Sequence, residues 1–412
     1  MTTSDLPMAD LAARWSELLL ADVGPGDRPT RAVRDTGSVL RPPATEDQVA
    51  ATERRIGRRL PPSYREFLLL SDGAYADMNG VRLVYPHGGP ERPPTESDVV
   101  GVVLLPVGDL RWLRDVDPFM ASLCAQDDDE PDPVVVDGEE AWPWTPFASG
   151  LVISVDHRPG TTCLVPVDGE QEWQVWHIAK ETSQVFVSFR SFLAHEVEVR
   201  EPVTTLAETF AVIERAERRD YRAVRRLARV TAPDAVDVLA GLLADRTSWA
   251  GHAVHALGRI GTDEAVDALA RVRPQGAPQA LLLAGSDRAR DVLAGWGCVT
   301  QLAALGDPRG TTLAVERLRP GAPTATRDEL NAAIQVLAVH GDAGHVDVLR
   351  PHLDGEPLTE FLAAHALAVL GAEAGRRRLE QIAAGDGPMH ASAEAWVQIL
   401  AQRDAAAGTE LA

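Results

Sequence analysis

The sequence predicts a two-domain protein, with an α+β domain over residues 1–200 and an all-α domain of helical repeats over residues 205–402. Two observations predict this division. Short β-branched and aromatic runs bounded by Gly, Pro and Asp fill the first half, and they stop near Leu206. After that point, a small residue, a Leu and a Gly recur at intervals of four, which is typical of stacked helix pairs.

Two short helices are expected early in the α+β domain. Thr45 and Gln48 have the spacing of a capping box, so a helix should begin after Thr45 and place Val49, Ile56 and Leu60 on one face. The following stretch, "LPPSYREFLLLSDGA", begins with two prolines, which end one helix and begin the next.

The second of these helices is expected to be buried. Tyr64, Phe67 and Leu68 are spaced i, i+3 and i+4 and form one apolar stripe, so they are predicted to lie in the core. Gly73 is predicted to supply the left-handed C-terminal cap of this helix.

A run of strands should follow and form an antiparallel sheet, with helices before and after it. The expected strands are residues 99–107, 133–136, 151–157, 161–167, 172–178 and 184–189.

The all-α domain is predicted from the repeated pattern small-x-x-x-Leu-x-x-x-Gly. The small residue allows close packing, the Leu fills a shared core and the Gly ends the helix, so neighbouring pairs must stack. The boundary is expected at residues 198–205, where Pro202 interrupts the chain. The five copies are Ala253/Leu257/Gly261, Ala277/Leu281/Gly285, Cys298/Leu302/Gly306, Ala333/Leu337/Gly341 and Ala363/Leu367/Gly371, and a sixth, Ala223/Leu227/Thr231, lacks the glycine.

The formal net charge of −21 is unevenly distributed. Residues 101–150 carry 11 acidic against 2 basic side chains. Such a chain repels phosphate backbones, so no nucleic-acid partner is expected, whereas a basic protein partner would suit it. Acidity that only keeps the protein in solution is the alternative.

The candidate partner-binding residues are an acidic run and the aromatic residues beside it, because aromatic side chains beside charge often anchor interfaces. A solvated acidic loop and core packing of the tryptophans are the alternatives. These candidates are Asp127, Asp128, Asp129, Glu130, Asp132, Glu139, Glu140, Trp142 and Trp144.

No catalytic residue, cofactor or metal is expected. The sequence contains no P-loop, GxSxG or HExxH motif, and the acidic run lacks the alternating ligands and glycine of a calcium loop. His252 and His255 have no acidic or cysteine partner close in sequence, so a structural pair is favoured over a metal site.

A cytoplasmic location is expected, with no membrane association. No run of 18 apolar residues occurs, and the first residues lack the pattern of a secretory signal. Cys124, Cys163 and Cys298 are far apart and include no CxxC, so a disulfide framework is not indicated.

The order of helix, Leu-Pro-x-x-Tyr-x-x-Phe-Leu-x-x-x-Asp-Gly and strand-rich segment resembles the SUKH superfamily, the Smi/Knr-type domain, over roughly residues 10–200. Two insertions, residues 83–98 and 127–140, depart from a compact copy. The second half resembles short HEAT-like repeats. The matching motif positions are Ile56, Leu60, Pro61, Tyr64, Phe67, Leu68, Asp72 and Gly73.

The resemblance implies a binding module and not an enzyme. Bacterial members of the superfamily are immunity proteins that bind and block toxins, often nucleases, and fungal relatives are regulators and scaffolds. The leading hypothesis is an immunity protein whose acidic surface binds a basic toxin domain. The alternative is a scaffold or regulatory adaptor that binds an endogenous protein.

Overall fold

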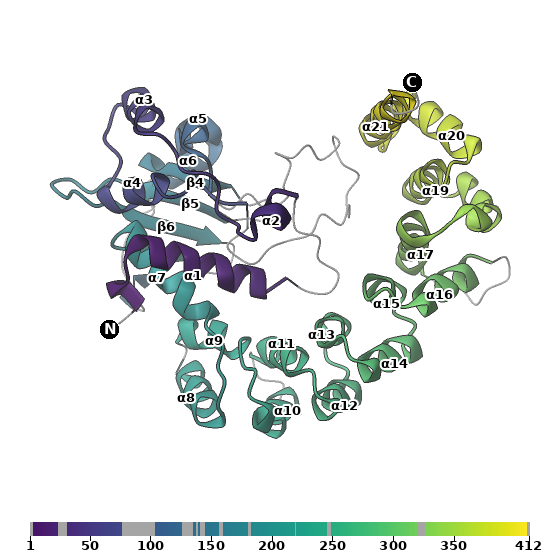
Figure 1. Ribbon diagram of the computed structural model, residues 1–412, viewed down its shortest axis with the longest axis horizontal. Helices are drawn as coiled ribbons and strands as arrows, with labels where there is room; N and C mark the ends of the chain where they lie inside the picture. Colours follow the sequence, from purple (N-terminus) through teal and green to yellow (C-terminus); the bar gives the residue numbers. More distant parts are fainter. Residues whose placement is uncertain are drawn as a thin grey trace. The chain divides into compact units, whose positions relative to one another are not determined.

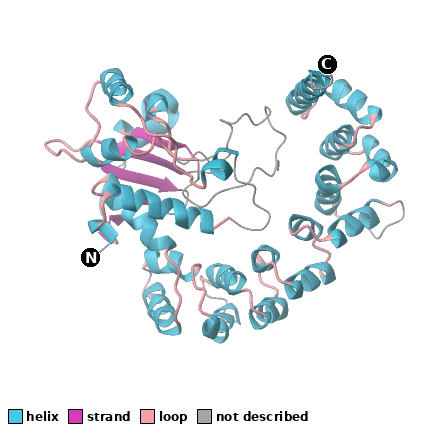
Figure 2. Cartoon of the chain, viewed as in Figure 1, coloured by secondary structure: helices cyan, strands magenta, loops and turns pink. Residues whose placement is uncertain are grey.

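The computed structural model describes residues 3–23, 31–75, 104–125, 135–136, 139–140, 145–155, 160–179, 183–218, 220–244, 249–319 and 326–409. The chain forms two compact units, and the change from the first to the second falls between Ala232 and Pro233. The first unit combines a sheet with helices, and the second is helical (Figures 1 and 2).

The first unit begins with helices whose ends are set by local sequence. The capping box is confirmed, because Thr45 Oγ1 accepts the Gln48 N–H at 3.2 Å and Gln48 Oε1 accepts the Thr45 N–H at 2.7 Å. The side chains of Val49, Ile56 and Leu60 are buried, as their spacing predicts. The helices before the sheet are η1 (Thr3–Asp5), α1 (Met8–Ala21), α2 (Arg31–Thr36), α3 (Glu46–Ile56) and α4 (Pro62–Leu68).

The prediction that Gly73 caps α4 is wrong. The helix ends at Leu68, and its cap residue Leu69 has a right-handed backbone. Gly73 does have a left-handed φ of 82°, but it serves a different contact. A Cβ at this position would lie 2.3 Å from the carbonyl oxygen of Leu104, so a glycine is needed where two chain segments meet.

The sheet has seven strands in the order β1-β4-β5-β6-β7-β2-β3. The first five in this order pair antiparallel, as predicted, but β2 pairs with β7 in parallel. β2 comes before β4 in the chain, but in the sheet it lies beside β7. The strands are β1 (Arg111–Trp112), β2 (Val135–Val136), β3 (Glu139–Glu140), β4 (Leu151–Val155), β5 (Gly160–Val165), β6 (Gln174–Ala179) and β7 (Ser183–Phe186).

The expected strand at residues 99–107 is not formed in its described part, residues 104–107. Leu104 makes one isolated antiparallel bridge to Ala74, and a 3-10 helix, η2 (Val107–Asp109), follows. Pro106 precedes η2 and has no N–H to donate to a neighbouring strand, which ends the extended chain there.

Side chains of the sheet alternate between two cores. Leu151, Ile153 and Leu164 join the larger core, which α1, α4 and α7 (Phe189–Arg200) complete. Val152 and Cys163 point to a smaller core on the other face. That face is covered by α5 (Leu113–Val116), α6 (Pro118–Ala125) and η3 (Thr145–Ser149).

The first helical pair after the sheet belongs to the first unit. α8 (Leu206–Glu217) packs on α9 (Tyr221–Leu227), and α9 packs on α7. Pro202 lies where α7 ends and the helical region begins, within the boundary expected from the sequence, whereas the compact units divide after Ala232.

The second unit contains helices in two alternating layers. α11, α13, α15, α17 and α19 each contact the next member of this series, and α10, α12 and α14 do the same. The bounds are α10 (Val236–Ala244), α11 (Ala250–Ile260), α12 (Asp263–Val272), α13 (Ala277–Ala284), α14 (Asp287–Gly295), α15 (Val299–Ala304), α16 (Pro308–Leu318), α17 (Arg327–His340), α18 (Val346–Leu349), α19 (Pro357–Val369), α20 (Glu373–Ala383) and α21 (His390–Thr409), with short 3-10 turns η4 (Pro233–Ala235), η5 (Ala343–His345) and η6 (Arg350–Asp354).

The repeated sequence pattern falls on one of these layers. Its five complete copies lie on or next to α11, α13, α15, α17 and α19, and the leucine of every copy is fully buried. Gly261 and Gly285 form left-handed caps, whereas Gly341 is extended. None of the described helices is both long enough and apolar enough to cross a membrane.

Candidate protein-binding surface

The Asp-Gly pair after α4 ties this helix to the segment that leads into the sheet. One carboxylate oxygen of Asp72 accepts the backbone N–H of Val107, the first residue of η2, at 2.6 Å. The Ala74 N–H donates to the Leu104 carbonyl at 3.0 Å beside the close approach at Gly73. These two motif residues therefore fix the position of η2 relative to α4.

The aromatic residues of the motif are structural. Tyr64 and Phe67 are fully buried, and both rings contact Phe189 of α7, at 4.8 and 5.0 Å between centroids. Burial, with the nearby Asp72 charge as a smaller cause, holds the pKa of Tyr64 far above its usual value. These side chains anchor α4 on α7 and leave no surface for a partner.

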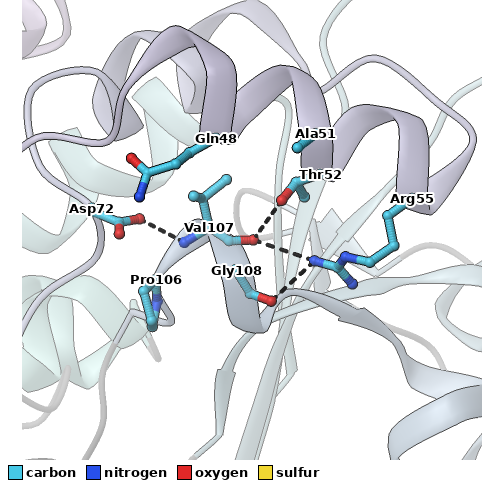
Figure 3. Close-up of a pocket in the computed structure, with 8 residues that line it drawn as sticks. All are labelled: Gln48, Ala51, Thr52, Arg55, Asp72, Pro106, Val107 and Gly108. Carbon is cyan, nitrogen blue, oxygen red and sulfur yellow. Dashed lines mark hydrogen bonds between the residues drawn. The ribbon is translucent and has the colours of Figure 1, made fainter.

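A pocket of about 420 Å³ lies between α3 and η2 (Figure 3). Thr52 Oγ1 donates to the Val107 carbonyl at 3.0 Å. The Arg55 guanidinium donates to the carbonyls of Val107, Gly108 and Leu110, at 3.4, 3.2 and 2.7 Å. Burial, with help from Arg111, lowers the pKa of Arg55. These hydrogen bonds to backbone carbonyls hold η2 on α3. Because the polar side chains are already used in this way, the pocket offers little to a ligand.

A second and larger hollow, of about 660 Å³, opens where α3 ends. Trp112 lines it and is held from two sides. Its Nε1–H donates to the Ile56 carbonyl at 3.3 Å, and its ring stacks on Trp173 at 6.2 Å. We call this the α3-end hollow. Its lining includes Ile56, Arg58, Trp112, Arg114, Pro166 and Asp168.

Of the candidate partner-binding residues, the structure describes Glu139 and Glu140. Asp127, Asp128, Asp129, Glu130, Asp132, Trp142 and Trp144 lie outside the described residues. Glu139 and Glu140 form β3, the last strand in the order of the sheet. The structure therefore places these two acidic residues at a sheet edge, next to β2.

The described part of the chain contains no cluster of side chains suited to a metal ion. No three His, Cys, Asp or Glu side chains there are arranged to hold a metal ion. His252 and His255 lie on α11, where the residues next to them in sequence are mostly alanine, valine and leucine.

Arg58, Arg114 and the half-buried Trp112 were not among the candidate binding residues expected from the sequence. A signal was present, since the end of α3 reads "ERRIGRR" and the β1 segment reads "RWLRD". Neither run shows by itself that the two segments share one hollow, because their contact depends on the tertiary fold.

Searches of curated proteins and of solved structures gave no significant match. A scan of family models did give one, and its span begins just before α3, includes the whole sheet and ends within α7. Over residues 43–195 the chain is similar to the SMI1 / KNR4 family (SUKH-1).

Proposed function

We propose that the protein is a non-catalytic immunity protein, which neutralises a bacterial toxin domain by binding to it in the cytoplasm. The observation that carries this proposal is the match of residues 43–195 to the SUKH-1 family, because such domains occur in immunity proteins. The motif residues Tyr64, Phe67 and Asp72 are used to build the domain, so a partner would bind elsewhere on its surface.

Electrostatics favour a basic partner. The chain carries a net charge of −21, and the segment with the strongest acidic excess contains residues 127–140. A nuclease toxin needs a basic surface to bind phosphates, so an acidic protein would both attract and cover that surface. Glu139 and Glu140 on β3 place part of this charge at an edge of the sheet.

The helical region supplies further surface. Its two layers of alternating helices, with buried Leu257, Leu281 and Leu302 at equivalent positions, support a HEAT-like repeat structure. Repeats of this kind present extended surfaces for protein partners. We propose that this region widens the contact with the toxin beyond the SUKH-like domain.

The acidic mechanism is tested by replacing Asp127, Asp128, Asp129 and Glu130 with Asn or Gln. Loss of four charges should slow association with the toxin domain by about tenfold at low salt and make binding less sensitive to salt. Stopped-flow or surface-plasmon measurements of the association rate at several salt concentrations give both quantities.

A matched control removes the same number of charges elsewhere. Glu316, Glu380, Asp386 and Glu394 are exposed on the helical region, and their replacement by amides should have a much smaller effect. If the two variants bind alike, or if neither changes the salt dependence, the acidic segment does not steer the partner.

A further inference from the structure

The α3-end hollow is basic, although the protein as a whole is acidic. Arg58 and Arg114 line it, and Asp168 is the acidic residue among its lining. Arg54 and Arg55 lie in the last turn of α3, and Arg114 lies in the last turn of the short helix α5, where cations stabilise a helix end. Arg58 lies beyond α3 and has no such role.

These two arginines are available to a partner. Arg58 is exposed and forms no ion pair with a carboxylate of the described residues. The Arg114 side chain is 70% exposed, and its nearest carboxylate, Asp115, lies 4.0 Å away and is also exposed. An exposed pair at this distance contributes almost nothing to stability, so Arg114 can exchange it readily.

Trp112 gives the hollow an ordered aromatic surface beside polar lining residues. Trp112 is fixed by its hydrogen bond to Ile56 and by stacking on Trp173. The Arg114 guanidinium lies 5.8 Å from the Trp112 ring centroid, within the range of a cation–π contact. A rigid aromatic surface with adjacent cations loses little conformational entropy on binding.

We propose that the α3-end hollow is a docking site for an acidic, extended segment of a partner protein. Carboxylates of that segment pair with Arg58 and Arg114, and an apolar side chain between them packs on Trp112. Arginine forms bidentate bonds with carboxylates, which gives this arrangement specificity as well as attraction.

An acidic peptide fits better than a nucleic acid. Two arginines recognise phosphates as well as carboxylates, but a chain with a net charge of −21 repels a polyphosphate over a longer range. A short peptide segment presents only a few charges, and the local arginines decide its binding.

This inference does not depend on the toxin hypothesis. The proposed toxin contact uses acidic residues to hold a basic surface, whereas this site uses basic residues to hold an acidic segment. Amide replacement of Asp127 to Glu130 tests the first, and replacement of Arg58 and Arg114 tests the second, so that either can fail without the other.

The experiment uses the full chain and fluorescein-labelled heptapeptides that carry Asp or Glu on both sides of one variable apolar residue. Matched peptides carry Asn and Gln in place of the acids. Fluorescence anisotropy at low salt should find acidic peptides that bind with a Kd below about 1 mM, and their amide forms should bind at least about tenfold more weakly.

Variants locate the binding. The double substitution Arg58→Glu with Arg114→Glu should weaken binding by about tenfold or more, while Asp168→Asn should tighten it, because it removes the opposing charge. The double substitution Arg271→Glu with Arg377→Glu, at exposed positions of α12 and α20, makes the same charge change elsewhere and should leave the affinity unchanged. Circular dichroism shows whether each variant is folded.

Three results would overturn the proposal. The first is that no acidic peptide binds below about 1 mM. The second is that folded Arg58→Glu/Arg114→Glu protein binds as tightly as the wild type. The third is that a decathymidine oligonucleotide binds more tightly than the peptides and loses affinity in the same variant.

Discussion

His195 on α7 is a titratable side chain in the interior of the first unit. Its ring packs against Phe186 at 5.0 Å, and neither ring nitrogen has a hydrogen-bond partner among the described residues. Burial lowers its pKa to about 4, with Glu196 acting in the opposite direction and Arg225, Arg222 and His177 in the same direction. His195 is therefore neutral in the folded protein at neutral pH.

We expect this residue to make stability depend on pH. In the unfolded chain the histidine pKa is near 6.5, so between pH 6.5 and about 4 the unfolded state binds a proton that the folded state does not. The contribution of His195 to the free energy of unfolding is fully present above pH 6.5. It is lost as the pH drops, by about 3 kcal/mol once the pH is below 4. Urea unfolding at pH 7.5, 5.5 and 4.5 measures this loss.

The variant His195→Leu should lose part of that pH dependence and be no less stable at pH 7.5, because it removes an unsatisfied buried polar group. His365 on α19 has a pKa lowered to about 4 by burial as well, so His365→Leu should have the same effect in the second unit. A pH profile that neither substitution alters would refute the buried neutral state of both residues.

At the scale of helices and strands, small residues set how closely elements pack. Gly258 and Gly251 both lie on α11, but they face different surroundings. A Cβ at Gly258 would lie 2.6 Å from the Ala280 carbonyl oxygen of α13, whereas a Cβ at Gly251 would meet nothing within 4 Å. The contact between α11 and α13 therefore depends on the absence of a side chain at position 258.

The substitution Gly258→Ala should destabilise the protein by about 1–3 kcal/mol, because α11 and α13 must move apart. Gly251→Ala should be neutral or stabilising by up to about 1 kcal/mol, since alanine favours the helix and has room there. Urea unfolding of the two variants compares them directly. Equal effects at both positions would show that the close contact between α11 and α13 is not required.

Most elements could be predicted from local patterns. The capping box of α3, the buried stripe of α4, the strands β4 to β7 and the repeated leucines of the second unit each depend on neighbouring residues. The parallel pairing of β2 with β7 and the true role of Gly73 could not be predicted, because they depend on contacts between distant segments. The α3-end hollow also depends on such contacts, because its lining comes from segments far apart in the chain.

At the scale of the whole molecule, a buried ionic cluster defines how far the first unit extends. Arg200 of α7 contacts Asp22 at 3.3 Å and Glu196 at 3.1 Å, and its side chain is 1% exposed. Two further arginines come from α9 and the residues just after it. Arg225 contacts Glu196 at 2.9 Å, and Arg229 pairs with Asp22. Burial alone would raise the pKa of Glu196, but Arg225 and Arg200 hold it far below its usual value.

A truncated chain that ends at residue 204 should therefore be less stable than one that ends at residue 232. Removal of Arg225 and Arg229 leaves Glu196 and Asp22 buried with too little positive charge, which costs about 3–5 kcal/mol. Urea unfolding of the two fragments measures the difference. Equal stability would place the boundary of the independent folding unit before α8.

A pull-down tests whether the protein binds a basic toxin domain through its acidic surface. The full chain is used as bait in extracts of its own cells and of co-cultured neighbours, with washes at low and high salt and identification by mass spectrometry. We expect a basic toxin domain that high salt releases. A resident housekeeping protein that stays bound at high salt would contradict this proposal and favour an adaptor that binds through other surfaces.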